Sequence, residues 1–250
     1  MAVRNRSSIR IGCAGWGIDR CSADRFGTGA SGLARYATVF DCTEINSSFH
    51  RAHRPETYAR WASSVPARFR FSVKLPKAIT HEMRLERTGH ALARFAEEVA
   101  GLGTKLGGLL VQLPPSLAYD ARVAGTFFSM LRRRVDAAVA CEPRHASWFT
   151  ERAGALWSRH GVARVAADPA MHADAGSPGG GGAWHYWRLH GAPRMYYSSY
   201  DDEALRALAA CMRAMAGRNR PAWCIFDNTA HGHATANALR LRELVSAEHS

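Results

Sequence analysis

The chain has 250 residues, of which 47% are hydrophobic, and its 33 basic and 21 acidic residues give a formal net charge of +12. No apolar run approaches the roughly 20 residues that a membrane-spanning helix needs, and the basic start "MAVRNRSSIR" lacks the apolar stretch of a secretory signal. These features argue against a membrane protein and predict a cytoplasmic protein with one domain over residues 1–250.

Eight short strand-like runs follow one another along the chain. They lie near residues 9–15, 41–46, 69–75, 107–113, 137–143, 162–168, 185–191 and 222–228. Seven amphipathic segments alternate with them, each long enough for a crossover between parallel strands. The sixth interval differs because its Gly-rich stretch 176–182 has no helical period. It is interpreted as a flexible loop, either a mobile connection or a lid over a site.

This alternation predicts an α/β fold, a (β/α)8 TIM-type barrel in which the Gly-rich loop replaces the sixth helix. A doubly wound sheet is less favoured, because no predicted strand is followed by a GxGxxG or Walker-type loop. The six cysteines form no CxxC pair, so a zinc knuckle is not indicated either. No cofactor is expected.

Polar side chains stand at the ends of the predicted strands, where a barrel has its active face. Residues two apart in a strand share one face, and three such polar pairs occur here. They are Glu44 with Asn46, Glu142 with Arg144, and Arg188 with His190. Buried charges are tolerated only when they pair with one another or with a ligand, so we expect these residues to meet in the mouth of the barrel. The alternative is that they are satisfied polar groups at the rim.

Lys74 ends the third predicted strand and is one of only three lysines, against thirty arginines. A lysine can lose its proton when it is removed from water, which suits acid/base chemistry, and its point charge also suits binding of an anion.

The sequence resembles the YecE-like family, also known as domain of unknown function 72. The motifs that carry the resemblance run from Gly12 to Leu241 and include "GCAGW", "TEINSSFHR", "FRFSVKLPKAITHE", "ACEPRHASWF", "YWRLHG" and "IFDNTAHGHATANALRL". The resemblance implies a TIM barrel without an established reaction. It places the family's polar cluster on Glu44, Asn46, Lys74, His81, Gln112, Glu142, Arg144, Arg188, His190 and Asn228.

We expect an enzyme that performs acid/base chemistry on a small anionic compound, phosphorylated or sugar-like. The catalytic candidates are Glu44, Lys74, Glu142 and His190. The candidates for substrate binding are Trp16, Asn46, His81, Gln112, Arg144, Asp168, Arg188 and Asn228. The rings of Trp16, Trp148 and Tyr200 either form a wall of the site or pack in the core.

Three other functions compete with this hypothesis. Carboxylates and histidines at the strand ends suit a metal ion, but Lys74, Arg144 and Arg188 would repel a cation, so no metal is expected. His231 and His233 fall at a predicted helix start, which favours capping or phosphate binding. The net charge and the segment "LRRRV" at 131–135 suggest a nucleic-acid partner. A binding barrel without catalysis is the last alternative, and the sequence does not indicate an oligomeric state.

Overall fold

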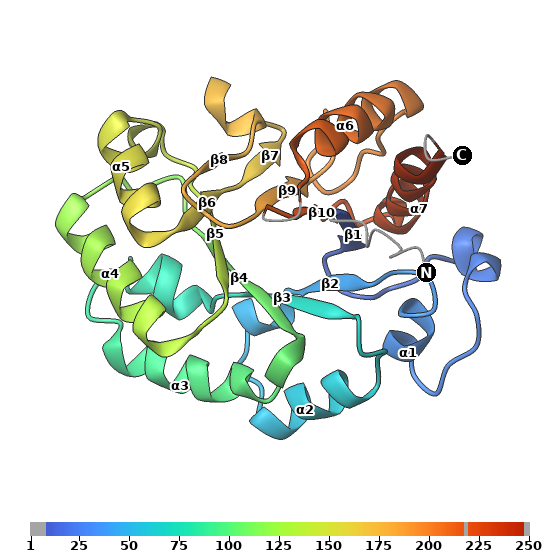
Figure 1. Cartoon of the computed structure of the whole chain (residues 1–250), viewed down its shortest axis with the longest axis horizontal. Helices are drawn as coiled ribbons and strands as arrows, with labels where there is room; N and C mark the ends of the chain where they lie inside the picture. The colour runs from blue at the N-terminus through green and yellow to red at the C-terminus, as the bar shows by residue number, and fades with distance from the viewer. Residues whose placement is uncertain (1–8, 218–219, 248–250) are drawn as a thin grey trace, which may run out of the picture.

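The computed structural model describes residues 9–217 and 220–247 and shows strands alternating with helices (Figure 1). The strands in this part of the chain are β1 (Ile9–Cys13), β2 (Cys42–Ile45), β3 (Arg70–Lys74), β4 (Leu106–Gln112), β5 (Ala138–Glu142), β6 (Val162–Arg164), β7 (Ala166–Asp168), β8 (Gly179–Gly180), β9 (His185–Leu189) and β10 (Ala222–Phe226). All eight predicted strands are present, and Val165 divides the sixth into β6 and β7.

The α-helices of the described residues are the seven that the amphipathic segments predicted. They are α1 (Gly32–Tyr36), α2 (Pro55–Ser63), α3 (Gly89–Ala100), α4 (Ala121–Arg134), α5 (Glu151–His160), α6 (Asp202–Met215) and α7 (His233–Ser246). Figure 1 shows them following one another around the strands in chain order. Shorter helical turns follow several strands, among them Ser47–Phe49 after β2 and a π-helical turn at Ala78–Glu82 after β3.

Side-chain caps explain where several helices begin. The side chains of Ser31, Asp120, Thr150 and Asp201 each accept a hydrogen bond from the backbone N–H three residues later. Such a cap satisfies an N–H group that has no partner inside the helix. Helix α5 ends at His160 and is followed by Gly161, whose φ of 58° is left-handed and therefore suits glycine.

The strands form two sheets, one in the order β1-β10-β9-β7 and the other in the order β2-β3-β4-β5-β6-β8. All named pairs are parallel except β6 with β8. The sheets meet after β1, where the Gly15 N–H donates to the Glu44 carbonyl of β2 at 2.8 Å. The chain also passes from one sheet to the other at Val165, between β6 and β7. The chain thus has the expected mixed α/β fold with parallel sheets and helices.

The strands contribute to two apolar cores. The larger one includes the buried helix faces, whereas the smaller one consists only of residues in or next to strands, such as Leu110, Tyr186 and Ile225. Three aromatic rings dominate the smaller core, where Trp184 lies 5.2 Å from Trp223 and 4.7 Å from Tyr186 between ring centroids. A Cβ atom at Gly108 of β4 would lie 2.3 Å from the Trp184 ring, so glycine makes room for the indole.

The sixth interval, residues 169–184, contains no α-helix, as expected from the sequence. Its Gly-rich stretch, whose composition suggests a flexible loop, packs closely against the fold. β8 pairs with β6, and Cβ atoms at Gly181 and Gly182 would lie 2.3 Å from Ser158 Cα and 2.4 Å from the Ala163 nitrogen. Here glycine permits close approach of two backbones.

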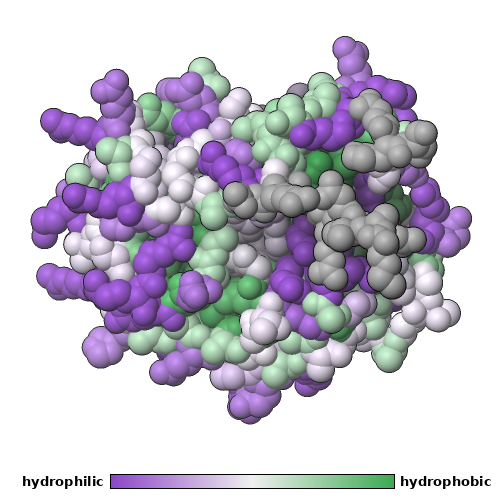
Figure 2. Space-filling model, viewed as in Figure 1, coloured by the Kyte–Doolittle hydropathy of each residue, from purple (hydrophilic) through white to green (hydrophobic). Residues whose placement is uncertain are grey.

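Among residues 9–217 and 220–247, no helix has both the length and the apolar character to cross a membrane. Figure 2 shows hydrophilic residues distributed over the visible face, interleaved with apolar ones.

Candidate functional site

A fully buried arginine, Arg188 of β9, lies at the centre of a polar cluster. Its guanidinium binds Glu44 of β2 through two hydrogen bonds, at 3.1 Å from Nε and 2.8 Å from Nη2. Its Nη1 donates to Glu142 of β5 at 2.7 Å, and its Nη2 also donates to Asp227, which follows β10, at 3.0 Å. One guanidinium therefore joins residues from four strands, and a planar fork of five donors suits this role better than an ammonium.

Tyr186 and Ser72 support this cluster from the side of the smaller apolar core. The Tyr186 hydroxyl donates to Glu44 Oε2 at 2.8 Å and is 2.9 Å from Ser72 Oγ, from which it accepts. All three side chains are fully buried. Glu44 is thus held by Arg188 and Tyr186 together, which makes it an anchor for the guanidinium.

His190 follows β9 and bridges two of the carboxylates. Its Nδ1 is 3.0 Å from Asp227 Oδ2, and its Nε2 is 3.2 Å from Glu142 Oε1. Glu142 Oε1 also accepts from Arg144 Nη2 at 2.8 Å and from Gln112 Nε2 at 3.3 Å. Two carboxylates facing the two ring nitrogens favour the doubly protonated imidazolium, which can donate to both.

The pKa values of these groups are displaced in the directions that a network of ion pairs predicts. Burial alone would raise the pKa of Glu142, but the charges of Arg188 and His190 outweigh burial and hold that pKa well below its usual range. The pKa of Asp227 is lowered for the same reason, against the opposing effect of burial. Burial would lower the pKa of His190, but the nearby Glu142 charge and the hydrogen bond to Asp227 raise it.

Lys74 ends β3 at the edge of the cluster and differs from the other cations. Burial and the charge of Arg188 lower its pKa from 10.5 to about 8, although Glu44 and Asp227 act in the opposite direction. Its Nζ lies 4.1 Å from the centroid of the Phe49 ring. No described carboxylate lies within ion-pair distance of that Nζ. Lys74 is therefore a charged group without a direct counter-ion.

The structure brings most of the predicted site residues together: Glu44, Asn46, Lys74, Gln112, Glu142, Arg144, Arg188 and His190. Asn46 Nδ2 donates to Asp227 Oδ1 at 3.3 Å, whereas Asn46 Oδ1 is buried without a partner. His81 lies beside them, since its ring centroid is 5.0 Å from that of Phe49 and burial and the Lys74 charge lower its pKa.

Three predicted residues lie outside this network. Trp16 packs its ring against Trp61, with centroids 5.2 Å apart. Asp168 contributes its backbone carbonyl, which accepts from the His190 N–H at 2.7 Å. Asn228 donates to the Ser198 carbonyl and to Asn237 Oδ1, both at 2.9 Å, so it fixes the loop before α6 to α7. Among the described residues, no side-chain hydrogen bond joins any of these three to the cluster.

Of the two alternatives for the remaining aromatic candidates, a wall of the site or packing in the core, Trp148 and Tyr200 follow the second. Trp148 is buried and stacks on Trp157, and the Tyr200 hydroxyl donates to the Asp168 carbonyl at 3.2 Å. Besides Phe49, the ring of Tyr196 lies beside the cluster; Tyr196 is 38% exposed and its ring is 5.8 Å from that of His190. Tyr196 has a φ of 70°, a left-handed conformation that is uncommon for a bulky residue.

Sequence reasoning omitted Asp227, Tyr186 and Tyr196 from the candidate site. For Asp227 and Tyr186, the available signal was the alternation of side chains between the two faces of a strand. On β9 the residues Tyr186, Arg188 and His190 share one face, and on the strand that leads into Asp227, Trp223 and Ile225 share the core with Tyr186. Asp227 continues the face of Trp223 and Ile225, whereas Asn228 does not. No comparable pattern indicated Tyr196, which lies in a loop.

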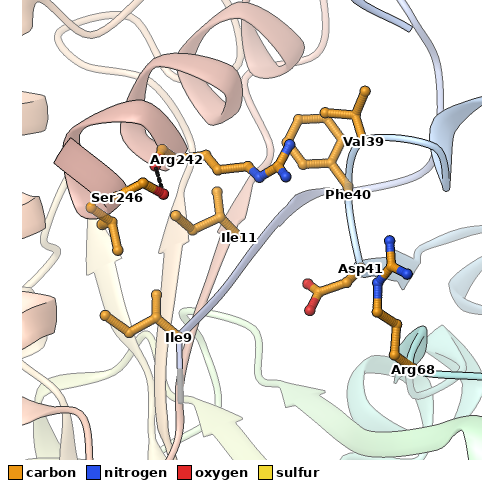
Figure 3. Close-up of a pocket in the computed structure, with 9 residues that line it drawn as sticks. Ile9, Ile11, Val39, Phe40, Asp41, Arg68, Arg242 and Ser246 are labelled. Atoms are coloured by element: carbon orange, nitrogen blue, oxygen red, sulfur yellow. Dashed lines mark hydrogen bonds between the residues drawn. The ribbon is translucent and has the colours of Figure 1, made fainter. Parts of the chain in front are cut away.

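The exposed side of the cluster contains a small cavity lined by Glu142, Arg144, His190, Met171 and Met195, among others. It has room for about one water molecule. A larger pocket of about 260 Å³ lies at the opposite ends of the strands, where Ile9 begins β1 and Asp41 precedes β2 (Figure 3). Its lining includes Arg68 and Arg242 and none of the cluster residues.

Several histidines that could bind a metal ion have other partners. In residues 9–217 and 220–247, no group of three or more histidine, cysteine, aspartate or glutamate side chains is arranged to hold a metal ion. His81 Nδ1 is 2.8 Å from Thr80 Oγ1. His231 and His233 lie near the start of α7 with ring centroids 6.1 Å apart, and His231 also contacts Tyr197.

Comparison with known proteins identifies relatives of the chain. Residues 10–250 match the family described as "Protein of unknown function DUF72". The chain is 30% identical over 86 residues to the UPF0759 protein YecE of Escherichia coli K12, and this alignment covers 34% of the chain and 32% of that protein. The chain is thus aligned with about a third of the length of the curated relatives that it matches.

Two solved structures have a similar fold. DUF72 family proteins from Enterococcus faecalis and Thermotoga maritima each superpose with a TM-score of 0.78 at 20% identity. Each superposition covers 95% of this chain, with 95% of the E. faecalis protein and 98% of the T. maritima protein. Because the family match extends over nearly the whole chain, this protein belongs to the DUF72 family, the YecE-like family that its motifs indicated.

Proposed function

We propose that the chain is an enzyme that performs acid/base chemistry on a small anionic compound, at the mouth of a (β/α)8 barrel. The two sheets would be the two halves of this barrel. Contacts between Gly15 and Glu44 on one side and the continuity of β6 with β7 on the other support closure. The polar cluster then occupies the carboxyl ends of the strands, where barrels of this type have their active sites.

The observation that carries the enzymatic proposal is the Lys74 ammonium beside a network that is already electrically balanced. Three carboxylates, Glu44, Glu142 and Asp227, oppose Arg188, Arg144 and protonated His190. Charged Lys74 adds one further positive charge, and no described carboxylate pairs with it. An anion that binds beside Lys74 and Arg144 would supply the missing counter-charge.

The roles follow from burial and hydrogen bonding. Arg144, whose side chain is 15% exposed, binds the anionic group, and Lys74 exchanges protons with the substrate because its pKa lies near neutral pH. His190 is held between Glu142 and Asp227, which fixes the ring and its protonation. Glu44 was expected to be catalytic, but its complete burial against Arg188 favours a supporting role. Asn46 Oδ1, buried without a partner, is available to accept from a substrate hydroxyl.

The nucleic-acid alternative gains little from the arginine-rich segment at the end of α4. Arg132 donates to the Ala137 and His160 carbonyls, and Arg134 donates to the Met130 carbonyl. Arg132 therefore links the end of α4 to neighbouring elements, whereas Arg134 binds a carbonyl within its own helix. Binding without catalysis remains the competing proposal.

A thermal-shift screen tests the proposal. The purified protein is heated with phosphosugars, carboxylic acids, nucleotides, short oligonucleotides or divalent metals, because a ligand at about 100 times its Kd stabilises by roughly 2.7 kcal/mol. We expect a small anionic compound to raise the Tm of wild type and of Arg122→Ala, an exposed α4 control, but not of Arg144→Ala. Stabilisation by oligonucleotides or metals alone would overturn the proposal, and stabilisation without any turnover of the bound compound would favour a binding protein.

A further inference from the structure

The three lysines of the chain have different surroundings. Lys105 Nζ donates to the Ala62 carbonyl at 2.6 Å, and Lys77 pairs with Glu82 at 3.4 Å with its side chain 52% exposed. Lys74 has neither a carbonyl nor a carboxylate partner among the described residues, and its Nζ lies over the Phe49 ring. It is thus the lysine whose amine is least engaged and closest to the polar cluster.

We propose that Lys74 forms a Schiff base with a small carbonyl compound that carries a carboxylate or phosphate group. This inference rests on the proposed function, since it assigns the substrate class of the same site. The amine ends β3 next to the buried Arg188, and Arg144 is the partly exposed cation of the cluster. Lys74 supplies the nucleophile, and Arg144 binds the anionic group.

The surroundings of Lys74 increase the fraction of its amine that is neutral, and therefore nucleophilic, near neutral pH. Burial and the Arg188 charge lower its pKa to about 8. At pH 7.5 roughly a quarter of the molecules would then carry a neutral Lys74, against about 0.1% for a lysine with the ordinary pKa. Only the neutral amine is nucleophilic, and a desolvated lysine beside another cation is a known way to produce it.

The chemistry balances without a further reactant. The Nζ lone pair forms a bond to the carbonyl carbon, and the carbonyl π electrons move to oxygen, which takes a proton. The C–O bond of this carbinolamine then breaks, and the oxygen leaves as water with one proton from the amine and one from solvent. The product is an iminium ion that keeps one N–H.

The cluster suits this product. The iminium carries the same positive charge as the ammonium that it replaces, and the charges of Glu44, Glu142 and Asp227 extend to this position. The carboxylate or phosphate of the substrate would neutralise the excess charge that Lys74 otherwise leaves in the site.

Reductive trapping tests the inference. The full chain is incubated at pH 7.5 with sodium cyanoborohydride and either glyoxylate, pyruvate, dihydroxyacetone phosphate or neutral acetone, and the modified lysines are located by peptide mass spectrometry. We expect adducts on Lys74 at least tenfold more abundant than on Lys77 or Lys105. A Lys74 adduct with glyoxylate or pyruvate would indicate a carboxylate substrate, and an adduct with dihydroxyacetone phosphate would indicate a phosphorylated one. Neutral acetone should react poorly.

Matched variants separate the Schiff base from simple binding. Lys74→Arg should abolish the adduct and Arg144→Ala should reduce it, whereas Lys77→Arg should leave it unchanged; Tm values and far-UV circular dichroism confirm folding. Equal or greater labelling of Lys77 would overturn the inference. An anionic probe that raises the Tm without reductant but gives no Lys74 adduct would overturn the Schiff base and leave the proposed function standing. Failure of every small anion to bind would overturn both.

Discussion

Arg188 and Glu44 form a bidentate ion pair in which both side chains are completely buried, with N···O distances of 3.1 and 2.8 Å. The pair connects β9 with β2, which belong to different sheets. A buried ion pair is not in itself a sign of high stability, because both charges lose their hydration. Removing one partner is costly, however, since the other charge is then left in the interior.

Arg188→Met should destabilise the protein by at least about 3–5 kcal/mol, because it leaves Glu44, Glu142 and Asp227 without their shared cation. The measurement is the free energy of unfolding in urea at pH 7. As a control, Arg206→Ala removes an exposed helical ion pair with Asp202 and should cost less than about 1 kcal/mol. A loss at Arg188 as small as that control would show that the carboxylates do not depend on the guanidinium.

Lys74→Met should have the opposite effect and stabilise the protein at pH 7. Burial and the neighbouring Arg188 disfavour the ammonium in the folded state, which is why its pKa falls to about 8. Since one pKa unit corresponds to about 1.4 kcal/mol, we expect a gain of roughly 1–3 kcal/mol at pH 7. A group that destabilises the fold is typical of functional sites, where stability is exchanged for activity.

The gain from Lys74→Met should also depend on pH. Between about 8 and 10.5 the unfolded chain binds a proton at Lys74 that the folded chain does not, so wild-type stability rises through this range relative to the variant. The gain is therefore complete below pH 8 and disappears towards pH 10.5. Urea unfolding at pH 7 and pH 10 measures it, with the exposed Lys77→Met as control. A pH-independent difference would mean that packing, and not charge, separates the two proteins.

His190→Gln should cost most stability at low pH. The Glu142 and Asp227 contacts raise the folded-state pKa of His190 above its usual value of 6.5, in spite of burial. A raised pKa gives stability that is complete below the unfolded-state value and is lost as the pH rises through the folded-state value. The difference in unfolding free energy between wild type and His190→Gln should therefore shrink as the pH is raised from 5.5 to 9.

His53 provides a control of opposite sign. Burial and the charge of Arg51 lower its pKa below 6.5, so its contribution should weaken as the pH falls below 6.5. If His53→Gln and His190→Gln showed the same pH trend, the assigned charge of His190 would be wrong.

The positions of the strands and helices along the chain were predictable because periodicity and length are local properties of the sequence. The pairing of polar residues two apart was equally local. Arg188 Nη1 lies 3.4 Å from His190 Nε2, and Arg144 Nη2 lies 2.8 Å from Glu142 Oε1. The sequence did not show which carboxylate each arginine binds. Arg188 and Glu44 are 144 residues apart, and their contact depends on how the strands are arranged in space.

Some candidate residues were chosen wrongly for the cluster because the alternation of side chains between the two faces of a strand was not applied to each residue. Asp168 and Asn228 were chosen because they end strands, yet each lies one position out of phase with the face that carries the cluster. Tyr196 could not be found in this way, since its position depends on a left-handed turn in a loop. The sequence thus showed that polar residues end the strands, but the structure was required to show which of them belong to the cluster.

The two aspartates at strand ends, Asp227 and Asp168, give a direct test of this distinction. Asp227→Asn replaces an acceptor for Arg188 and His190 and should destabilise the protein by about 1.5–3 kcal/mol, the usual value of hydrogen bonds to charged groups. It should also lower the pKa of His190, because one of the two groups that raise it is neutralised. Asp168→Asn retains the backbone carbonyl that binds the His190 N–H and should change stability by less than about 0.5 kcal/mol.

Urea unfolding and NMR titration of the His190 ring measure both effects in the same pair of variants. The two substitutions make the same chemical change at the ends of β7 and β10, so a difference between them reports position alone. If Asp168→Asn shifted the His190 titration as strongly as Asp227→Asn, the Asp168 side chain would belong to the cluster after all. If neither did, the hydrogen bond between His190 Nδ1 and Asp227 Oδ2 would not control the charge of the ring.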